Sequence, residues 1–350
     1  MYFDGDDRMK ILVGISGGVD SAAAAKRLIG DGHTVEGIVL IMHEHTELCA
    51  AREAAMSIGI PLHEVDCTVE FDRVVKENFV SEYRSARTPN PCIICNERVK
   101  FRYMYEYAVA HGFDRIATGH YASVVKISDG LGERYAIAAG KDKRKDQSYM
   151  LHRLPSTILE KLLLPLADEE KTDVRAFADS VGISAADRPD SQEICFLPDG
   201  NHADFIESVA GKCPEGDFVD EEGHPLGRHR GIIRYTVGQR KGLGIALGER
   251  VFVTAIDAEK NTVTLSPTHT GRARIDLADV VCTGLAVAGE PVKLRAEVKI
   301  RYTAPLAWAE ATVYPDGTAS LIFDSPVKAA PGQSAVAYRD GTVLFGGIIR

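Results

Sequence analysis

Hydrophobic positions in the first third of the chain follow two different periods. Short runs rich in aliphatic residues predict four β-strands, at Ile11–Val13, Val35–Ile41, Leu62–Val65 and Arg115–Thr118. Between two of these runs, apolar residues recur at helical spacing at Phe71, Val74, Val75 and Phe79. Because strands that alternate with helices are typical of βαβ units, this part of the chain predicts a parallel sheet.

The pattern changes further along the chain. Helical spacing returns from about 152 to 181, and a Pro-Asp-Gly turn at 198–200 predicts the end of the first domain. The following segment is rich in glycine and basic residues. It predicts short strands within 217–223, 231–237 and 250–256.

From about residue 275 apolar and charged residues alternate strictly, as in the run from Val292 to Arg301. Such alternation is typical of a half-buried antiparallel strand. Further strands around 309–313, 320–323, 334–338 and 343–349 predict a small β-barrel. The predicted fold is therefore an α/β parallel-sheet domain over residues 1–202, a small β-rich central domain over 203–273 and a C-terminal β-barrel over 274–350.

Composition narrows the class of protein. The 350 residues are 45% hydrophobic, and no apolar run approaches the roughly 20 residues that a membrane span requires. The N-terminus is acidic where a secretory signal is basic, so we expect a cytoplasmic protein with no membrane partner. A net charge of −9 disfavours binding nucleic acid by charge alone, but local basic tracks occur at 141–145 and 228–241.

A glycine turn follows the first predicted strand and precedes an alanine-rich helix. Its backbone N–H groups and the helix N-terminus would suit a phosphate. A P-loop needs lysine beside its last serine or threonine, and Asp20 occupies that place; Asp20 could hold magnesium or cap the helix. The turn comprises Gly14, Ile15, Ser16, Gly17, Gly18, Val19, Asp20 and Ser21.

A second turn, Thr118-Gly119-His120, follows the fourth predicted strand. Because ligands of parallel sheets bind beyond the carboxyl ends of the strands, we expect both turns to face one site.

Seven cysteines, an odd number without a secretory signal, argue against a disulfide framework. Cys92 and Cys95 have C-x-x-C spacing, which suits a redox dithiol, half a zinc site or two ligands of an iron–sulfur cluster. Zinc is disfavoured because no second ligand pair follows. Taken alone, Cys195 resembles a small buried hydrophobic residue, and the same interpretation serves for Cys49, Cys67, Cys213 and Cys282.

Several motifs occur in one order along the chain. They are SGGVDS at 16–21, TPNP at 88–91 with Cys-Asn at 95–96, ATGHY at 117–121, KDQSY at 145–149, an isolated Cys195, TVGQRKGLG at 236–244 and PGQSAVAY at 331–338. The first is similar to the signature of PP-loop ATP pyrophosphatases. The ordered set, over nearly the whole length, resembles the tRNA-specific 2-thiouridylase family, which places sulfur on the wobble uridine (position 34) of certain tRNAs.

The resemblance implies a reaction. ATP, with magnesium, would be held by residues 14–21, Leu40 and Gly119, and would convert the uridine C2 oxygen into an adenylate. Cys95 would act as nucleophile and Cys195 would carry a persulfide, with a transient Cys95–Cys195 disulfide that a reductant reopens. Leu40 departs from the methionine common at that place, although the adenine ring needs only an apolar surface.

The resemblance also implies partners, and it makes the central domain over residues 203–273 a tRNA-binding domain and the domain over 1–202 the ATP-binding catalytic domain. The substrates would be tRNAs for Lys, Glu and Gln, and a cysteine desulfurase or a relay protein would supply sulfur. The residues implied in tRNA contact are Asn90, Pro91, Cys92, His120, Lys145, Asp146, Gln147, Arg301, Tyr302 and Gln333.

Cys92 departs from the family pattern, because well-known members carry aspartate there. A carboxylate could tune a neighbouring thiol or transfer a proton, and a thiol would not do so in the same way. With Cys92, Cys95 and Cys195, three thiols could instead hold a [4Fe–4S] cluster that carries sulfide. Two rival functions are a PP-loop synthetase that adenylates a small molecule and a non-enzymatic nucleotide-binding or tRNA-binding module.

Overall fold

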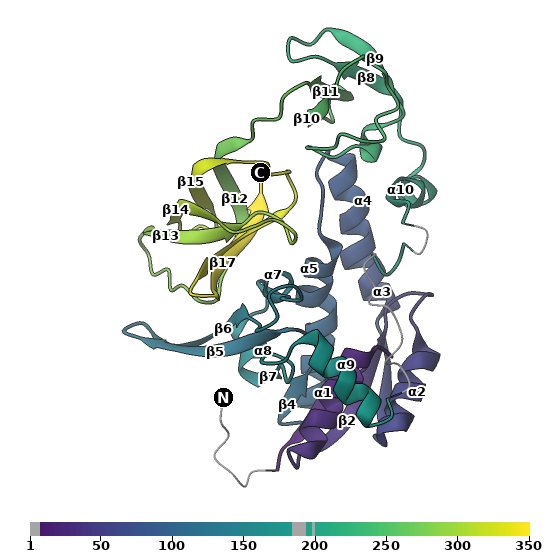
Figure 1. Cartoon of the computed structure of the whole chain (residues 1–350), viewed down its shortest axis with the longest axis vertical. Helices are drawn as coiled ribbons and strands as arrows, with labels where there is room; N and C mark the ends of the chain where they lie inside the picture. Colours follow the sequence, from purple (N-terminus) through teal and green to yellow (C-terminus); the bar gives the residue numbers. More distant parts are fainter. Residues whose placement is uncertain (1–7, 184–193, 198–199) are drawn as a thin grey trace. The chain divides into compact units, whose positions relative to one another are not determined.

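The computed structural model describes residues 8–183, 194–197 and 200–350, and the chain forms two compact units (Figure 1). Unit 1 comprises the chain up to Val74, then Cys92–Phe196 and Asp340–Leu344. Unit 2 comprises Val75–Pro91, Leu197–Arg339 and Phe345–Arg350. The predicted domain boundaries at 202 and 273 stay predictions.

A five-stranded parallel sheet forms the centre of unit 1, as the sequence predicted. The central strand β1 lies between β2 and β4, and its residues Ile11, Leu12 and Val13 are fully buried because helices cover both faces. The strand order is β3 (Leu62–Asp66), β2 (Thr34–Ile41), β1 (Lys10–Gly14), β4 (Arg115–Ala117) and β7 (Leu162–Leu163).

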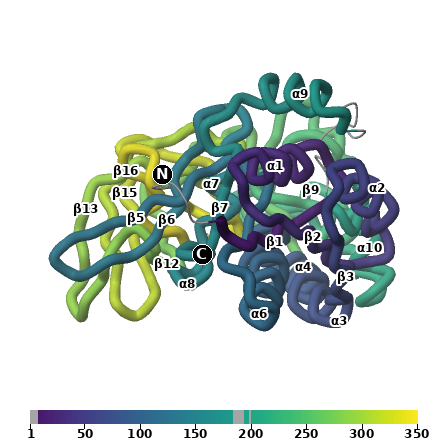
Figure 2. Tube along the Cα trace, turned by 90° about the horizontal axis from the view of Figure 1, so that it is seen from below, coloured from purple at the N-terminus to yellow at the C-terminus, as the bar shows by residue number. Residues whose placement is uncertain are grey.

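Helices lie on both faces of this sheet. Figure 2 shows α1 (Val19–Gly30) on one side of the strands and α6 (Phe101–Ala110) on the other. The core on the α1 side includes α2 (Leu48–Ile58) and α9 (Lys171–Ser180). The four alanines at 22–25 have no exposed surface, and their small side chains let α1 approach the strands closely.

Two helical stretches contain a π-helical turn. The first consists of α3 (Thr68–Phe71), the π-helix η1 (Asp72–Lys76) and α4 (Glu77–Arg84). The second consists of α5 (Pro91–Cys95), the π-helix η2 (Asn96–Lys100) and α6. The spacing of apolar residues predicted the first stretch as helical but gave no sign of the π turn.

The rest of unit 1 differs in part from the prediction. An antiparallel hairpin, β5 (Ala122–Asp129) and β6 (Gly132–Ala139), was not predicted. It is followed by α7 (Ser148–Leu151) and α8 (Ser156–Lys161). The prediction of helix across 152–181 is wrong at β7, where Leu162 and Leu163 pair with the edge of the parallel sheet.

Unit 2 contains a small sheet that starts the predicted β-rich region. Its order is β10 (Phe252–Asp257), β11 (Thr262–Ser266), β8 (Gly216–Val219) and β9 (Pro225–His229), and α10 (His202–Ala210) precedes it. The predicted strand within 231–237 is wrong, because Ile232–Arg234 forms the 3₁₀-helix η3. Both Ile232 and Ile233 are buried in this turn.

The C-terminal strands close into the predicted antiparallel barrel (green to yellow in Figure 1). Ala296 and Val298 are buried while Lys293 and Arg295 are exposed, so the alternation along β13 is confirmed. Pairing of β12 with β17 completes the ring. The strands are β12 (Arg272–Cys282), β13 (Val292–Lys299), β14 (Ala307–Val313), β15 (Ala319–Val327), β16 (Ser334–Arg339) and β17 (Thr342–Ile349).

No helix within the described residues is long and apolar enough to span a membrane.

A buried histidine in unit 1 predicts acid sensitivity. His152 has no exposed surface, its Nδ1 donates to the Tyr149 carbonyl at 2.8 Å, and burial lowers its pKa to about 3. Because the unfolded chain binds this proton below pH 6.5 and the folded chain does not, the stabilisation is complete above pH 6.5 and is lost as pH falls toward 3.

Lowering the pH from 7.5 to 5.0 reduces the free energy of unfolding. We expect this reduction to be about 2 kcal/mol larger in the native chain than in His152→Gln. Urea unfolding at the two pH values measures the difference. Equal pH dependence in the two proteins would show that His152 is not held neutral.

Candidate functional site

The glycine turn (residues 14–21) connects β1 to α1 as the sequence predicted. Gly17 has φ +82°, and a Cβ there would lie 2.6 Å from the Ala50 Cβ, so only glycine fits. Ser21 Oγ donates to the Gly18 carbonyl at 2.9 Å and lies 3.4 Å from Ser16 Oγ. The serines therefore hold the turn together from inside.

The N-terminus of α1 faces this turn without a side-chain cap in the described part of the chain. Gly18 occupies the N-cap position, so the first N–H groups of the helix are available to an anion. The alternative that Asp20 caps the helix is wrong, because its side chain is directed elsewhere.

Asp20 forms an ion pair with a lysine far along the chain. Its carboxylate oxygens lie 2.6 and 2.7 Å from Lys171 Nζ, and Tyr121 OH donates to Oδ1 at 2.8 Å. The Lys171 side chain is 8% exposed, so solvent screens this pair weakly. The sequence did not indicate that Lys171 and Tyr121 contact Asp20, since 151 and 101 residues separate them from it.

The loop after β4 approaches the glycine turn, which confirms that the two predicted turns are adjacent. A Cβ on Gly119 would lie 2.6 Å from the carbonyl carbon and oxygen of Asp20. The next residue, His120, lies 2.9 Å from Thr118 Oγ1 through its Nδ1, and burial lowers its pKa to about 3, with the Lys100 charge adding to the effect. His120 is therefore neutral near pH 7. Leu40, near the end of β2, is buried.

Three thiols in unit 1 are near enough for the charge of one to alter the pKa of another: Cys92, Cys95 and Cys195, here named the thiol cluster. Burial raises the pKa of Cys95 to about 12, and the charges of Cys195 and Cys92 add to this rise. Burial also raises the pKa of Cys92 and of Cys195, although both side chains reach solvent. The cluster thus joins the C-x-x-C pair to a cysteine about a hundred residues away.

The interpretation of Cys195 as a buried core residue is wrong, because its side chain is exposed. It is also wrong for Cys49, which is exposed at the start of α2, whereas Cys67 is buried and Cys213 and Cys282 are half-buried. Two further sulfur atoms accompany Cys95. Met42 Sδ accepts from its thiol at 3.6 Å, and the charge of Cys67 also raises the Cys95 pKa.

Lys100 is the positive charge that acts on the thiol cluster. Its charge opposes the effect of burial by lowering the pKa of all three thiols. The π-helix η2 explains its position, because a π turn brings residues five apart, here Cys95 and Lys100, to one face. The α-helical periodicity of the sequence would have placed them apart.

Asp146 and Gln147, both predicted tRNA-binding residues in unit 1, have side chains engaged within the protein. Asp146 is buried and accepts from Gly140 N, Ser148 N and Ser148 Oγ. Gln147 Oε1 accepts from Tyr121 N at 2.9 Å. Lys145 is half-buried beside them. The roles of these residues toward tRNA stay predictions.

Three of the sequence motifs meet at Thr88 in unit 2. Thr88 N donates to the Pro331 carbonyl at 2.8 Å, and Gln333 Nε2 donates to the Thr88 carbonyl at 2.8 Å. Thr88 Oγ1 also lies 3.5 Å from Thr236 Oγ1. Gln333 therefore positions the segment that leads to Asn90 and Pro91, both also predicted site residues.

Arg301 and Tyr302 follow β13 directly. Arg301 is exposed and Tyr302 is half-buried, with Lys299 Nζ 5.6 Å from the centre of its ring. Their predicted contact with tRNA is untested.

Comparison with known proteins gives consistent matches over most of the chain. Residues 9–199 match the family model described as tRNA methyl transferase HUP domain, 203–267 match the tRNA methyl transferase PRC-barrel domain, and 285–349 match the Aminomethyltransferase beta-barrel domain. A 4-thiouridine synthetase–RNA complex with bound ATP is 17% identical, with a TM-score of 0.36 over 57% of this chain and 49% of that one.

Two curated relatives cover nearly all of both chains. The tRNA-specific 2-thiouridylase MnmA of Acetivibrio thermocellus is 41% identical over 98% of this chain and 99% of its own length. The protein of the same name from Treponema denticola is 40% identical over 97% of this chain and 98% of its own. The chain belongs to the tRNA-specific 2-thiouridylase family.

Proposed function

We propose that this protein is a tRNA-uridine 2-sulfurtransferase that uses ATP to replace the C2 oxygen of the wobble uridine, at position 34, with sulfur. The observation that carries the proposal is the interaction of Cys92, Cys95 and Cys195 in one unit, in a chain whose full-length relatives are named 2-thiouridylases. A cytoplasmic location and tRNAs for Lys, Glu and Gln as substrates are part of the same proposal.

Two of the family models carry the name methyl transferase, but methyl transfer and sulfur transfer make different demands on the site. Transfer of a methyl group needs neither an activated C2 oxygen nor a second thiol. Delivery of sulfur needs one thiol to carry the atom and another to release it. The thiol cluster therefore favours sulfur transfer.

ATP would bind at the glycine turn, with its phosphates at the N-terminus of α1 and its adenine against Leu40 and Gly119. Attack of the uridine C2 oxygen on the α-phosphorus would release pyrophosphate and leave an adenylate. Magnesium would accompany the phosphates. Asp20 is already bound by Lys171 and Tyr121, so direct ligation by Asp20 would require that ion pair to open.

A persulfide on Cys195, formed by a desulfurase or relay protein, would supply the sulfur. Its terminal sulfur attacks C2, AMP leaves, and uridine is joined to Cys195 through a disulfide. The Cys95 thiolate then attacks the Cys195 sulfur, which forms a Cys95–Cys195 disulfide and releases 2-thiouridine. An external reductant supplies two electrons to restore both thiols. Alternatively, Cys95 first releases the persulfide sulfur as hydrosulfide, which attacks C2.

A second candidate mechanism is favoured by Cys92. Its charge raises the pKa of both other thiols, and three cysteines are the number of protein ligands that a [4Fe–4S] cluster with one open iron requires. Such a cluster would supply bound sulfide as the sulfur source. The persulfide route needs only Cys95 and Cys195, whereas the cluster needs all three residues.

Serine substitutions test the sulfur chemistry. We expect Cys95→Ser and Cys195→Ser each to lower 2-thiouridine formation by at least about 100-fold, since each removes a sulfur that exchanges bonds. Nucleoside mass spectrometry of tRNA incubated with enzyme, ATP and a sulfur donor measures the product. Cys49→Ser, at an exposed position outside the cluster, is the matched control and should retain activity. Full activity of Cys95→Ser would exclude the mechanism and favour a synthetase that needs no thiol.

Iron content separates the two routes. The persulfide route predicts that anaerobically purified enzyme without iron or acid-labile sulfide is fully active, and that Cys92→Ser retains activity. If activity instead rises with iron, toward about four atoms per chain, and Cys92→Ser loses it, the cluster replaces the persulfide.

Gly119→Ala tests the ATP site. A methyl group 2.6 Å from the Asp20 carbonyl must displace the glycine turn, so we expect about a 100-fold loss in kcat/KM for ATP. Gly30→Ala, at the end of α1 with no atom within 4 Å of the new methyl, is the control. Titration calorimetry with ATP and the thermal unfolding midpoint separate loss of binding from loss of fold. Unchanged ATP binding in Gly119→Ala would place the nucleotide elsewhere.

A further inference from the structure

The loop from Gly238 to Arg250, named here the arginine loop, lies in unit 2 and leads into β10. Its first residues are fixed to the sheet, because Gly238 N donates to the Val253 carbonyl at 2.8 Å and Val253 N donates to the Gln239 carbonyl at 2.9 Å. The Gln239 side chain accepts from Thr236 N and donates to the Lys241 carbonyl, both at 3.0 Å. Backbone and side-chain hydrogen bonds therefore both fix the start of the loop.

Four glycines define the path of this loop. Gly238, Gly242, Gly244 and Gly248 have φ of +91°, +73°, +74° and +78°, a region that other residues rarely adopt. The loop therefore follows a specific path that depends on glycine at four positions, and the family resemblance at 236–244 includes three of them.

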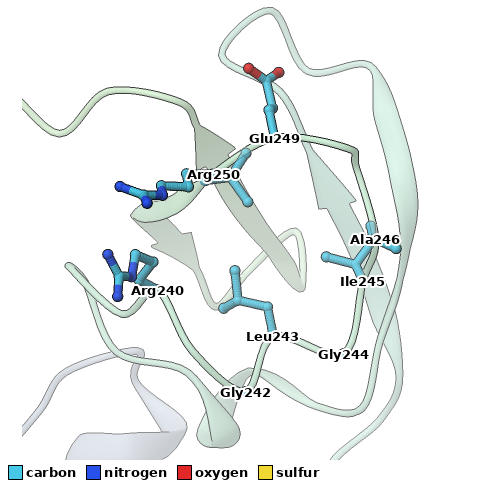
Figure 3. Close-up of a pocket in the computed structure, with 9 residues that line it drawn as sticks. Arg240, Gly242, Leu243, Gly244, Ile245, Ala246, Glu249 and Arg250 are labelled. Atoms are coloured by element: carbon cyan, nitrogen blue, oxygen red, sulfur yellow. The ribbon is translucent and has the colours of Figure 1, made fainter.

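A cavity of about 620 Å³ opens within the loop, and aliphatic side chains line part of it. Leu243 and Val251 are buried and Ile245 is half-buried. Figure 3 shows the side chains of Arg240 and Arg250 on the same side of the loop, and the carboxylate of Glu249 directed away from both. The two positive charges thus lie together beside an apolar surface.

Neither arginine has an ion pair or hydrogen bond within the described residues, and both are exposed. Two other arginines of the same region are neutralised. Arg228 is 2.8 Å from Asp217, and Arg234 is 2.8 Å from Glu207. The chain has a net charge of −9, so two adjacent unpaired guanidinium groups form a local positive site that attracts an anion.

We propose that the arginine loop binds a backbone phosphate of tRNA between Arg240 and Arg250. Guanidinium groups match the geometry of phosphate oxygens, to which they donate paired hydrogen bonds. This inference rests on the proposed function, because tRNA is the substrate named there. It adds a binding site in unit 2, separate in sequence from the tRNA-binding residues predicted above.

The test compares tRNA binding by fluorescence anisotropy over a range of salt concentrations. We expect Arg240→Gln and Arg250→Gln each to weaken binding by about tenfold. Each should also lower the slope of log affinity against log salt by about one. The Lys variants at both positions keep the charge and should keep the slope. Arg228→Gln, an exposed arginine already paired with Asp217, is the matched control and should bind nearly as the native chain does.

Native-like affinity and slope in the double Gln variant would overturn the proposal, and so would an equal loss in Arg228→Gln. An equal loss in the Lys variants with an unchanged slope would show a change of loop shape and would also overturn it. Failure of the proposed function has a different signature, in which the native chain itself neither binds nor thiolates tRNA.

Discussion

The contact between Gly119 and the backbone of Asp20 fixes the site in unit 1. A Cβ at position 119 would lie 2.6 Å from the Asp20 carbonyl, so the two segments approach as closely as glycine allows. This contact joins the turn after β1 to the loop after β4, at the edge of the sheet where ligands of parallel sheets bind. The Lys171–Asp20 ion pair connects α9 to the same place. The proposed ATP site depends on this contact.

Burial and the positive charge of Lys100 set the protonation state of the thiol cluster. Cys95 has a pKa of about 12, so it is a thiol near neutral pH and reacts slowly with solution oxidants. Lys100 acts in the opposite direction on all three cysteines. The proposed chemistry therefore requires that Cys95 lose its proton as sulfur is released, and Lys100 lowers the cost of that step.

The sequence predicted the elements whose side-chain period is regular. The parallel strands and the alternating barrel strand β13 are confirmed, because burial on two faces or one face imposes those patterns. The adjacency of the two turns followed from the topology of a parallel sheet. The prediction of a strand within 231–237 was wrong because the successive buried residues Ile232 and Ile233 suit a 3₁₀ turn as well as a strand. Lys100 was missed because a π turn, which leaves no periodic signal, sets its position.

The most direct test of the function is mass spectrometry of tRNA nucleosides from a strain that lacks the gene. Loss of 2-thiouridine from the anticodon wobble position, restored by the native gene and not by the Cys95→Ser form, is the predicted result. Retention of 2-thiouridine at normal levels would contradict the assignment.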